Sequence, residues 1–263
     1  MNEMLPRRNL IGSRDEAWCP PTFTPTASLR DRAIAAARRF LDLQAGSIWR
    51  DLARLLPACR GVVLDVGAGA QPYRSLVGPA ATYRAIDDAR ALSNFGYSIP
   101  DTTYYEGDRW PVEDRSVDVV LCTETLEHVA DPATFLAEGA RCLKPGGRLV
   151  MTVPFAARWH YIPHDYWRFT PSSLDALLGK AGFTGIAVYA RGNALTVACY
   201  KTMALVLPLL FPKSKGVASV ASRAMGLLSM PALVALAAIA AASMGGRGGD
   251  DCLGYTVVAE TRA

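Results

Sequence analysis

Acidic residues are missing from a long part of this 263-residue chain: residues 176–249 contain no aspartate or glutamate, against seven lysines and arginines. The same region holds two apolar runs, TVACYKTMALVLPLLF and MGLLSMPALVALAAIAAASM, and the second is uncharged over 20 residues. Lys201 and Pro208 make the first run a poor bilayer span. We therefore expect residues 194–249 to form a helical hairpin in peripheral contact with an anionic membrane surface. A buried lid or a dimer interface is the alternative, and the oligomeric state stays open.

Close cysteine pairs are also missing. The six cysteines are scattered with no CxxC motif, which indicates reduced thiols rather than a disulfide framework. The first 18 residues, MNEMLPRRNLIGSRDEAW, lack the apolar core of a secretory signal. We therefore expect the protein in the cytoplasm, on the cytoplasmic face of the membrane if the insertion binds there.

A basic stripe interleaved with aromatic residues is absent as well, and the net charge is only +4. Nucleic acid is therefore not an expected partner. The length suits one domain with additions. We expect a flexible tail over residues 1–27, cover helices over 28–60, an α/β domain made of 61–192 and 251–263, and a hydrophobic, basic helical insertion over 193–250.

Strand-like and helix-like segments alternate along the α/β region. VVLDVGAGAQ (residues 62–71) is an apolar run that ends in a glycine turn, and Pro72 is expected to begin a short helix, QPYRSLV, directed at a ligand. Asp131-Pro132 and Thr170-Pro171 are typical starts of two further helices. FTGIAVYA and GYTVVAET read as the last two strands. This alternation predicts a doubly wound α/β sheet that binds ligands beyond the carboxyl ends of its strands.

The segment before the sheet predicts two amphipathic helices. Leu29, Ala33, Ala36 and Phe40 recur at helical spacing and define an apolar face, and a second apolar series continues after Gly46. From the residues alone, these helices are expected to cover the core.

Four segments in order carry a family resemblance: LDVGAG, then TYRAIDD, then GDRW to CTETLEHV, then LKPGGRLVMTVPF. Together they resemble the class I S-adenosylmethionine-dependent methyltransferases, most closely the group that includes the quinone-biosynthesis enzymes, over about residues 61–189. The resemblance implies a seven-stranded Rossmann-like methyltransferase sheet, S-adenosylmethionine as cofactor, and cover helices over the cofactor cleft. The helical insertion before the last strand is additional to this pattern.

The resemblance assigns cofactor contacts to particular positions. Asp65 would organise the methionine ammonium group, directly or through water, and Gly67 and Gly69 would let the backbone approach the ligand. Asp87 would accept hydrogen bonds from the ribose hydroxyls, with Asp88 as the rival for this role.

The adenine end has its own candidates. Asp108 would accept from the adenine amino group, the Arg109 backbone N–H would face the ring, and Thr123 would lie on the cofactor side. A nicotinamide dinucleotide is the competing cofactor, but Pro72 stands where its motif needs a third glycine.

The acceptor side is expected in FAARWHYIPHDYWRF, residues 155–169, a loop rich in aromatic residues after the fifth strand. Arg168 is a further candidate for orienting the acceptor or binding an anion. The candidate catalytic residues are those that can move a proton or orient the acceptor: His160, His164, Asp165, Glu124 and Tyr166.

Other members of this region have structural roles in our interpretation. Trp159, Trp167 and Phe169 are expected to pack, and His128 in LEHV is expected to be structural. A metal site from His160, His164 and Asp165 is disfavoured, because Pro163 prevents a regular helical face. No metal is therefore expected.

These observations favour methyl transfer from S-adenosylmethionine to a small molecule. O-methylation of a lipid-linked or amphipathic acceptor, such as a glycan-lipid or a quinone-like compound, is the leading hypothesis, since HDYWRFT is similar to a run in members linked to glycan or lipid-glycan metabolism. The alternatives are a noncatalytic, membrane-associated partner protein of the same fold and an NAD(P)-dependent oxidoreductase.

Overall fold

The computed structural model describes residues 28–96, 98–212, 216–246 and 248–263. The predicted tail over residues 1–27 lies outside the described residues.

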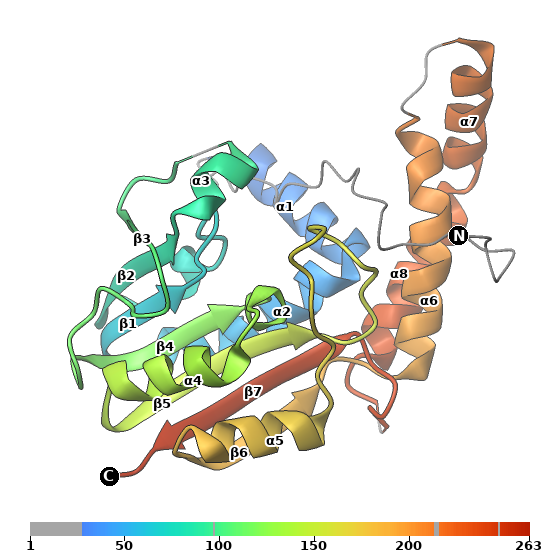
Figure 1. Cartoon of the computed structure of the whole chain (residues 1–263). Coiled ribbons are helices and arrows are strands. Elements are labelled where there is room, and N and C mark those ends of the chain that lie inside the picture. Colours follow the sequence, from blue (N-terminus) through green and yellow to red (C-terminus); the bar gives the residue numbers. More distant parts are fainter. Residues whose placement is uncertain (1–27, 97, 213–215, 247) are drawn as a thin grey trace, which may run out of the picture.

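A seven-stranded sheet forms the centre of the molecule (Figure 1), in the order β3-β2-β1-β4-β5-β7-β6. Strands β1 to β5 run parallel, and β7 pairs antiparallel with both β5 and β6. The strands are β1 (Gly61–Val66), β2 (Ala81–Asp88), β3 (Thr102–Tyr105), β4 (Val117–Thr123), β5 (Leu143–Pro154), β6 (Phe183–Ala190) and β7 (Gly254–Thr261). The predicted doubly wound, seven-stranded α/β sheet is confirmed.

Helices cover both faces of this sheet. The α-helices of the described residues are α1 (Leu29–Leu41), α2 (Leu43–Leu55), α3 (Arg90–Phe95), α4 (Pro132–Cys142), α5 (Pro171–Lys180), α6 (Ala194–Val206), α7 (Val217–Leu228) and α8 (Met230–Ser243), and α2, α4 and α5 provide this cover. One core joins α4 and α5 to the sheet through Leu136, Leu174 and Leu178. A second core joins α2 to the opposite face through Ile48 and Leu52. The central strands are thus buried on both sides, as their apolar sequence predicts.

The two N-terminal helices differ from prediction at their junction. The break lies at Asp42, whose carboxylate accepts from the Ala45 backbone N–H and caps α2. Gly46 lies inside α2, where a Cβ atom would stand 2.1 Å from the Arg39 carbonyl oxygen. This glycine lets α1 and α2 approach closely and does not end a helix. The predicted packing of α1 is also wrong, since Leu29 and Phe40 are exposed.

The helix predicted to begin at Pro72 is likewise absent from the described chain, which has only a three-residue 3₁₀ turn, Arg74–Leu76, at this point. Gln71 adopts a φ of 54°, and its side-chain amide donates to the Thr102 hydroxyl at 2.8 Å. Tyr73 is buried against the domain. These tertiary contacts hold the segment in a turn, so no α-helix N-terminus points at the ligand edge here.

Between β6 and β7 the chain forms α6, a 3₁₀ turn (Leu207–Leu210), α7 and α8. Helices α6 and α8 pack side by side, and α7 extends beyond them (Figure 1). Their shared core contains Cys199, Met203, Leu233 and Ala237, and it reaches Leu43 of α2. Within the described ranges, no single helix is long and apolar enough to cross a membrane, although α7 and α8, bent by 47° at their junction, satisfy the length and composition together.

Candidate active site

A cavity of about 890 Å³ lies beyond the carboxyl ends of the central parallel strands. Its wall is built from the turn after β1, the ends of β2 and β4, helices α1 to α3, and the loop after β5. This volume is at the upper end of the range typical of small-molecule sites. The location is the one that the alternating sequence predicts for a doubly wound sheet.

The turn after β1 brings backbone to the cavity wall. Gly67 adopts a φ of +69°, and a Cβ atom there would lie 2.3 Å from the Thr125 methyl group. Its backbone N–H donates to the Ile86 carbonyl at 3.0 Å, and the Gly69 N–H donates to an Asp87 oxygen at 2.9 Å. Both glycines line the cavity. A side chain at position 67 would require a strained backbone and a displaced neighbour.

Asp87 and Asp88 both line the cavity at the end of β2, but their surroundings differ. Each Asp87 oxygen accepts one backbone N–H, from Gly69 and from Asp88, and burial raises its pKa to about 6. Burial also opposes ionisation of Asp88, yet hydrogen bonds from Arg90 outweigh it and lower the Asp88 pKa. The Arg90 guanidinium engages both Asp88 oxygens. Asp87 is therefore the better placed of the two to accept from a ligand.

Asp108 lies on the cavity wall and is exposed, between Gly107 and the buried ring of Trp110. The ring of Trp110 packs edge-on against Phe135, at 5.0 Å between centroids, and also lines the cavity. The side chain of Arg109 is 3.5 Å from Asp114. Arg109 is not among the described residues on the wall, so the predicted contact of its backbone N–H with adenine stays a prediction.

Asp65 is placed differently from the other two predicted acids. It is 1% exposed, accepts a hydrogen bond from the Tyr83 hydroxyl at 2.6 Å, and has a pKa raised to about 7 by burial. Its other oxygen has no hydrogen-bond partner among the described residues. Asp65 is not one of the described wall residues of the cavity, and it lies in the strand that leads into the glycine turn. Any contact with a ligand would be indirect in this arrangement.

Thr123 and Glu124 line the cavity at the end of β4. Glu124 adopts a φ of +49° and forms an ion pair with Arg191, with 2.8 Å between Nη2 and Oε1. Arg191 is 2% exposed and also donates to the Val153 carbonyl and the Ser47 hydroxyl. The pair joins β4 to the end of β6 and the N-terminal cover helix.

Arg191 is one of the seven basic residues in 176–249 whose excess favoured contact with an anionic membrane, and the structure places it elsewhere. It is a buried partner of a site carboxylate. Arg191 directly follows a predicted strand, and Glu124 lies just after another. Because such strand ends lie at one edge of a sheet, this position was the available signal that the two side chains could meet. Lys213, Lys215 and Arg247 lie outside the described residues.

The loop after β5 brings His160, His164 and Tyr166 to the cavity wall. Asp165 is not among the described wall residues. Burial opposes its ionisation, but hydrogen bonds from Arg168 and His160 outweigh this and lower its pKa. An ionised carboxylate held in this way positions its neighbours and is a poor proton acceptor. The loop is tied to α3 by a 2.6 Å hydrogen bond from Asn94 to the Tyr161 hydroxyl.

Two packing predictions for this loop are wrong. Phe169 is buried as expected, but Trp159 and Trp167 are exposed large side chains. The Trp167 indole N–H donates to the Val129 carbonyl at 2.9 Å, so its polar edge is held by the chain while its ring lies over Phe169 at 6.1 Å. The aromatic composition alone could not assign these faces.

Several wall residues were missed from the sequence. Trp49 of α2 lies 6.3 Å from Tyr73 between ring centroids, under the guanidinium of Arg39 at 4.3 Å. Tyr200 of α6 also lines the cavity, so the insertion contributes to the site. Ala45 and Trp49 both line the cavity and lie one helical turn apart. This i, i+4 spacing, which places them on one face of α2, was the available signal in the sequence.

From the sequence, His128 is expected to be structural and Glu127 is given no role in the site. Burial lowers the His128 pKa to about 4 and raises that of Glu127 well above its usual value. His128 lines the cavity, while Glu127 is fully buried behind it. The predicted site residues are thus divided between the wall and the layer behind it, and their individual roles stay predictions.

Comparison with known proteins agrees with this architecture. Residues 64–151 match the family model described as a methyltransferase domain. A ubiquinone biosynthesis O-methyltransferase of Cereibacter sphaeroides is 33% identical over 158 residues, which cover 51% of this chain and 64% of that protein.

Two solved structures share the fold. Phosphoethanolamine N-methyltransferase 2 of Haemonchus contortus, in complex with S-adenosyl-L-methionine, matches with a TM-score of 0.53 and 13% identity over 88% of this chain and 57% of that one. A SAM-dependent methyltransferase of Thermotoga maritima, titled as a possible histamine N-methyltransferase, matches with a TM-score of 0.52 and 16% identity over 88% of this chain and 96% of that one.

Coverage of the curated relatives is partial. The chain spans 64% of the length of the Cereibacter sphaeroides protein and 32% of that of a protein encoded in a transposon of Streptomyces fradiae. Residues 64–151, which match the family model, contain the glycine turn and two acids that line the cavity, Asp87 and Asp108. The chain therefore has the fold of class I methyltransferases, and its residues 64–151 resemble a methyltransferase domain.

Proposed function

We propose that the protein transfers a methyl group from S-adenosylmethionine to a small amphipathic acceptor. The observation that carries this proposal is the common cavity bordered by the glycine turn, Asp87 and Asp108, all within the matched methyltransferase segment. A carboxylate at the end of β2 suits a ribose diol, and one beyond β3 suits an adenine amino group. The nicotinamide alternative lacks its third glycine, since Pro72 occupies that position.

O-methylation is the reaction that the wall residues support best. An acceptor hydroxyl gives its proton to a base, its oxygen bonds to the methyl carbon, and the carbon–sulfur bond breaks to release S-adenosylhomocysteine. His164 is the base that we favour, because it lines the cavity and its Nδ1 lies 3.4 Å from the Tyr166 hydroxyl. The ring of His160 is held by the Arg158 carbonyl and by Asp165.

An amphipathic or lipid-linked acceptor is favoured by the insertion. Leu205 and Leu228 are each 80% exposed, and Lys201 and Arg223 are exposed nearby in sequence, without an acidic residue between 176 and 249. Basic side chains beside exposed apolar ones suit an anionic lipid surface. Helix α6 carries both Leu205 and the cavity residue Tyr200, which connects this surface to the acceptor side.

Calorimetric titration of the full chain tests the cofactor. We expect S-adenosylmethionine and S-adenosylhomocysteine to bind with one site each and NADH not to bind. Absence of binding by both sulfur compounds would exclude the proposed enzyme, and binding of NADH alone would favour the oxidoreductase.

Turnover separates the enzyme from a noncatalytic protein of the same fold. The protein is incubated with methyl-labelled S-adenosylmethionine and either a lipid extract or a soluble metabolite pool. We expect label in an organic-phase product that depends on the protein and is sharply reduced by His164→Asn. Cofactor binding with no transfer to either pool would instead favour the noncatalytic alternative.

A further inference from the structure

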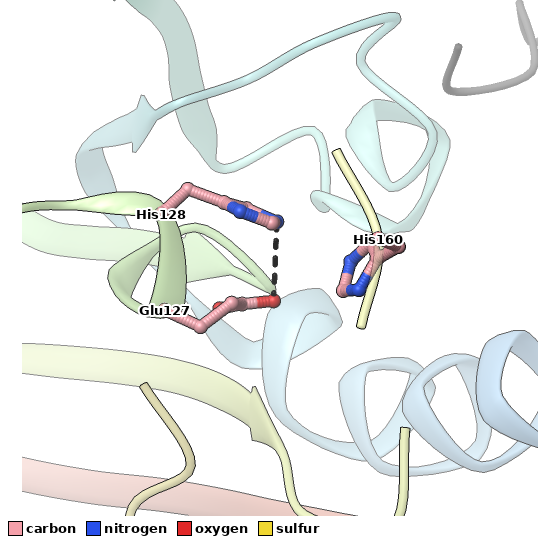
Figure 2. A group of neighbouring side chains, drawn as sticks. All are labelled: Glu127, His128 and His160. Carbon is pink, nitrogen blue, oxygen red and sulfur yellow. Dashed lines mark ion pairs between the residues drawn. The ribbon is translucent and has the colours of Figure 1, made fainter. Parts of the chain in front are cut away.

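Three side chains converge where the acceptor loop meets the turn after β4. Glu127 and His128 belong to the 3₁₀ turn after β4 (Leu126–His128), and His160 comes from the loop after β5. One ligand atom from each of the three lies within 4.8 Å of the other two (Figure 2). Such spacing matches donors that surround a single ion.

Glu127 is the least expected member of this cluster. Its side chain is 0% exposed, and within the described part of the chain neither carboxylate oxygen has a hydrogen-bond partner. The dashed line in Figure 2 joins its Oε1 to His128 Nε2 at 3.6 Å, which is too long for a hydrogen bond. Burial of a carboxylate without hydrogen bonds is costly unless a cation or another partner compensates it. An ionised Glu127 therefore requires a cation close to its carboxylate oxygens.

Both imidazoles are oriented in the way that metal-binding histidines are. His128 Nδ1 lies 2.8 Å from the His164 carbonyl oxygen, so this nitrogen donates and the lone pair of the neutral ring is on Nε2, facing Glu127. His160 Nδ1 lies 3.0 Å from the Arg158 carbonyl and 3.1 Å from Asp165. A carbonyl or carboxylate on the second ring nitrogen is the usual support of a histidine ligand.

Asp165 is itself fixed by two hydrogen bonds from Arg168, of 2.6 and 2.9 Å. The cluster thus has donor groups and a supporting layer. This arrangement differs from the disfavoured set of His160, His164 and Asp165, because Asp165 supports the ring of His160 and His164 contributes its backbone carbonyl.

We propose that Glu127, His128 and His160 form a binding site for one divalent transition-metal ion. Two imidazoles and one carboxylate suit Zn²⁺, Co²⁺, Fe²⁺ or Mn²⁺, whereas Mg²⁺ and Ca²⁺ prefer oxygen ligands. His128 and His160 also line the cavity, so the ion would lie at its wall. The proposal concerns metal binding alone and does not depend on the proposed methyl transfer.

Metal binding is measured on the full chain without an affinity tag. The protein is stripped with chelator, titrated with Zn²⁺ by calorimetry, and loaded with Co²⁺ for absorption spectroscopy. We expect one tightly bound Zn²⁺ per chain and Co²⁺ d–d bands that Zn²⁺ abolishes. Glu127→Gln and His160→Asn should each weaken Zn²⁺ binding by at least about 100-fold, and Asp165→Asn by about tenfold, as supporting residues do.

His164→Asn is the matched control, because it removes a histidine from the same loop and keeps the carbonyl that orients His128. We expect its affinity for Zn²⁺ to equal that of the unchanged protein. His160 is in a loop and only partly buried, so its variant remains informative if Glu127→Gln fails to fold. Absence of stoichiometric Zn²⁺ binding, or equal loss in His164→Asn and His160→Asn, would overturn the proposal.

Discussion

At the scale of single residues, two neighbouring carboxylates of the site, Asp87 and Asp88, have pKa values shifted in opposite directions. Asp87 is held by backbone N–H groups and has a raised pKa, while Arg90 engages Asp88 and lowers its pKa. The two acids are adjacent at the end of the same strand, yet only Asp87 changes its protonation state near neutral pH. This difference provides a way to decide which of them binds the ribose.

We expect affinity for S-adenosylmethionine to fall by about tenfold between pH 7 and pH 5, because ribose hydroxyls donate to ionised Asp87, whose pKa is about 6. Protonation of an acid with a raised pKa favours the folded state below that pH, so weaker binding would not reflect unfolding caused by this residue. Calorimetric titrations across this pH range measure the effect.

The variants Asp87→Asn and Asp88→Asn separate the two candidates. Asp87→Asn should bind about tenfold more weakly at pH 7 and lose the pH dependence, since hydrogen bonds to a charged acceptor contribute about 1.5–3 kcal/mol. Asp88→Asn should keep the pH dependence. The reverse pattern would assign the ribose contact to Asp88.

The ion pair between buried Arg191 and partly buried Glu124 leads to a prediction about stability. Arg191→Met should lower the free energy of unfolding by about 3 kcal/mol, because it leaves a site carboxylate without its cation. Urea denaturation of this variant, of Glu124→Gln and of the double variant measures the coupling between them. Additive effects in the double variant would show that the two side chains do not stabilise each other.

At the scale of elements, the turn after β1 depends on a residue that has no side chain. Gly67→Ala should destabilise the fold by about 1–3 kcal/mol, since its φ is +69° and a Cβ atom would meet Thr125. It should also abolish measurable binding of S-adenosylmethionine, because the backbone at the cavity wall would move. Thermal unfolding and calorimetry check the two effects.

Gly179→Ala in α5 is the matched control. Apart from its chain neighbours and the backbone of its own helix, no heavy atom of the described residues lies within 4 Å of a Cβ built there, and the position is helical. The substitution should stabilise the protein by about 0.5–1 kcal/mol and leave cofactor binding unchanged. A similar loss in both variants would mean that the turn after β1 has no special requirement for glycine.

Elements with strong local signals were predicted well. The strands over Phe183–Ala190 and Gly254–Thr261 begin and end where their apolar patterns do, and Pro132 and Pro171 begin helices behind capping residues. The turn at Arg74–Leu76 and the role of Gly46 were not predictable in this way. Both depend on contacts with distant segments, which override the local preference.

At the scale of the whole molecule, the insertion presents exposed leucines on α6 and α7. The double variant Leu205→Glu, Leu228→Glu should lower partitioning onto vesicles of anionic phospholipid by at least about tenfold, since it removes two apolar side chains and adds negative charge. Flotation with vesicles of anionic and of neutral lipid measures the binding.

Leu29→Glu is the control for this surface, because Leu29 on α1 is 82% exposed, close to the 80% of Leu205 and Leu228. It should leave partitioning unchanged. Deletion of the whole insertion is a poorer test, since α6 and α8 share a core with Leu43 of α2. If the unchanged protein fails to float with anionic vesicles, the proposed membrane contact is wrong.

The amino-acid sequence by itself determined the order of strands and helices, the glycine turn and the acids at strand ends, because these follow from local periodicity and backbone preference. Only the tertiary structure decided that Asp65 lies behind the cavity wall, that Arg191 pairs with Glu124, and that Glu127, His128 and His160 converge. Burial and charge pairing depend on segments far apart in the chain. No local pattern specifies which side chains such segments bring together.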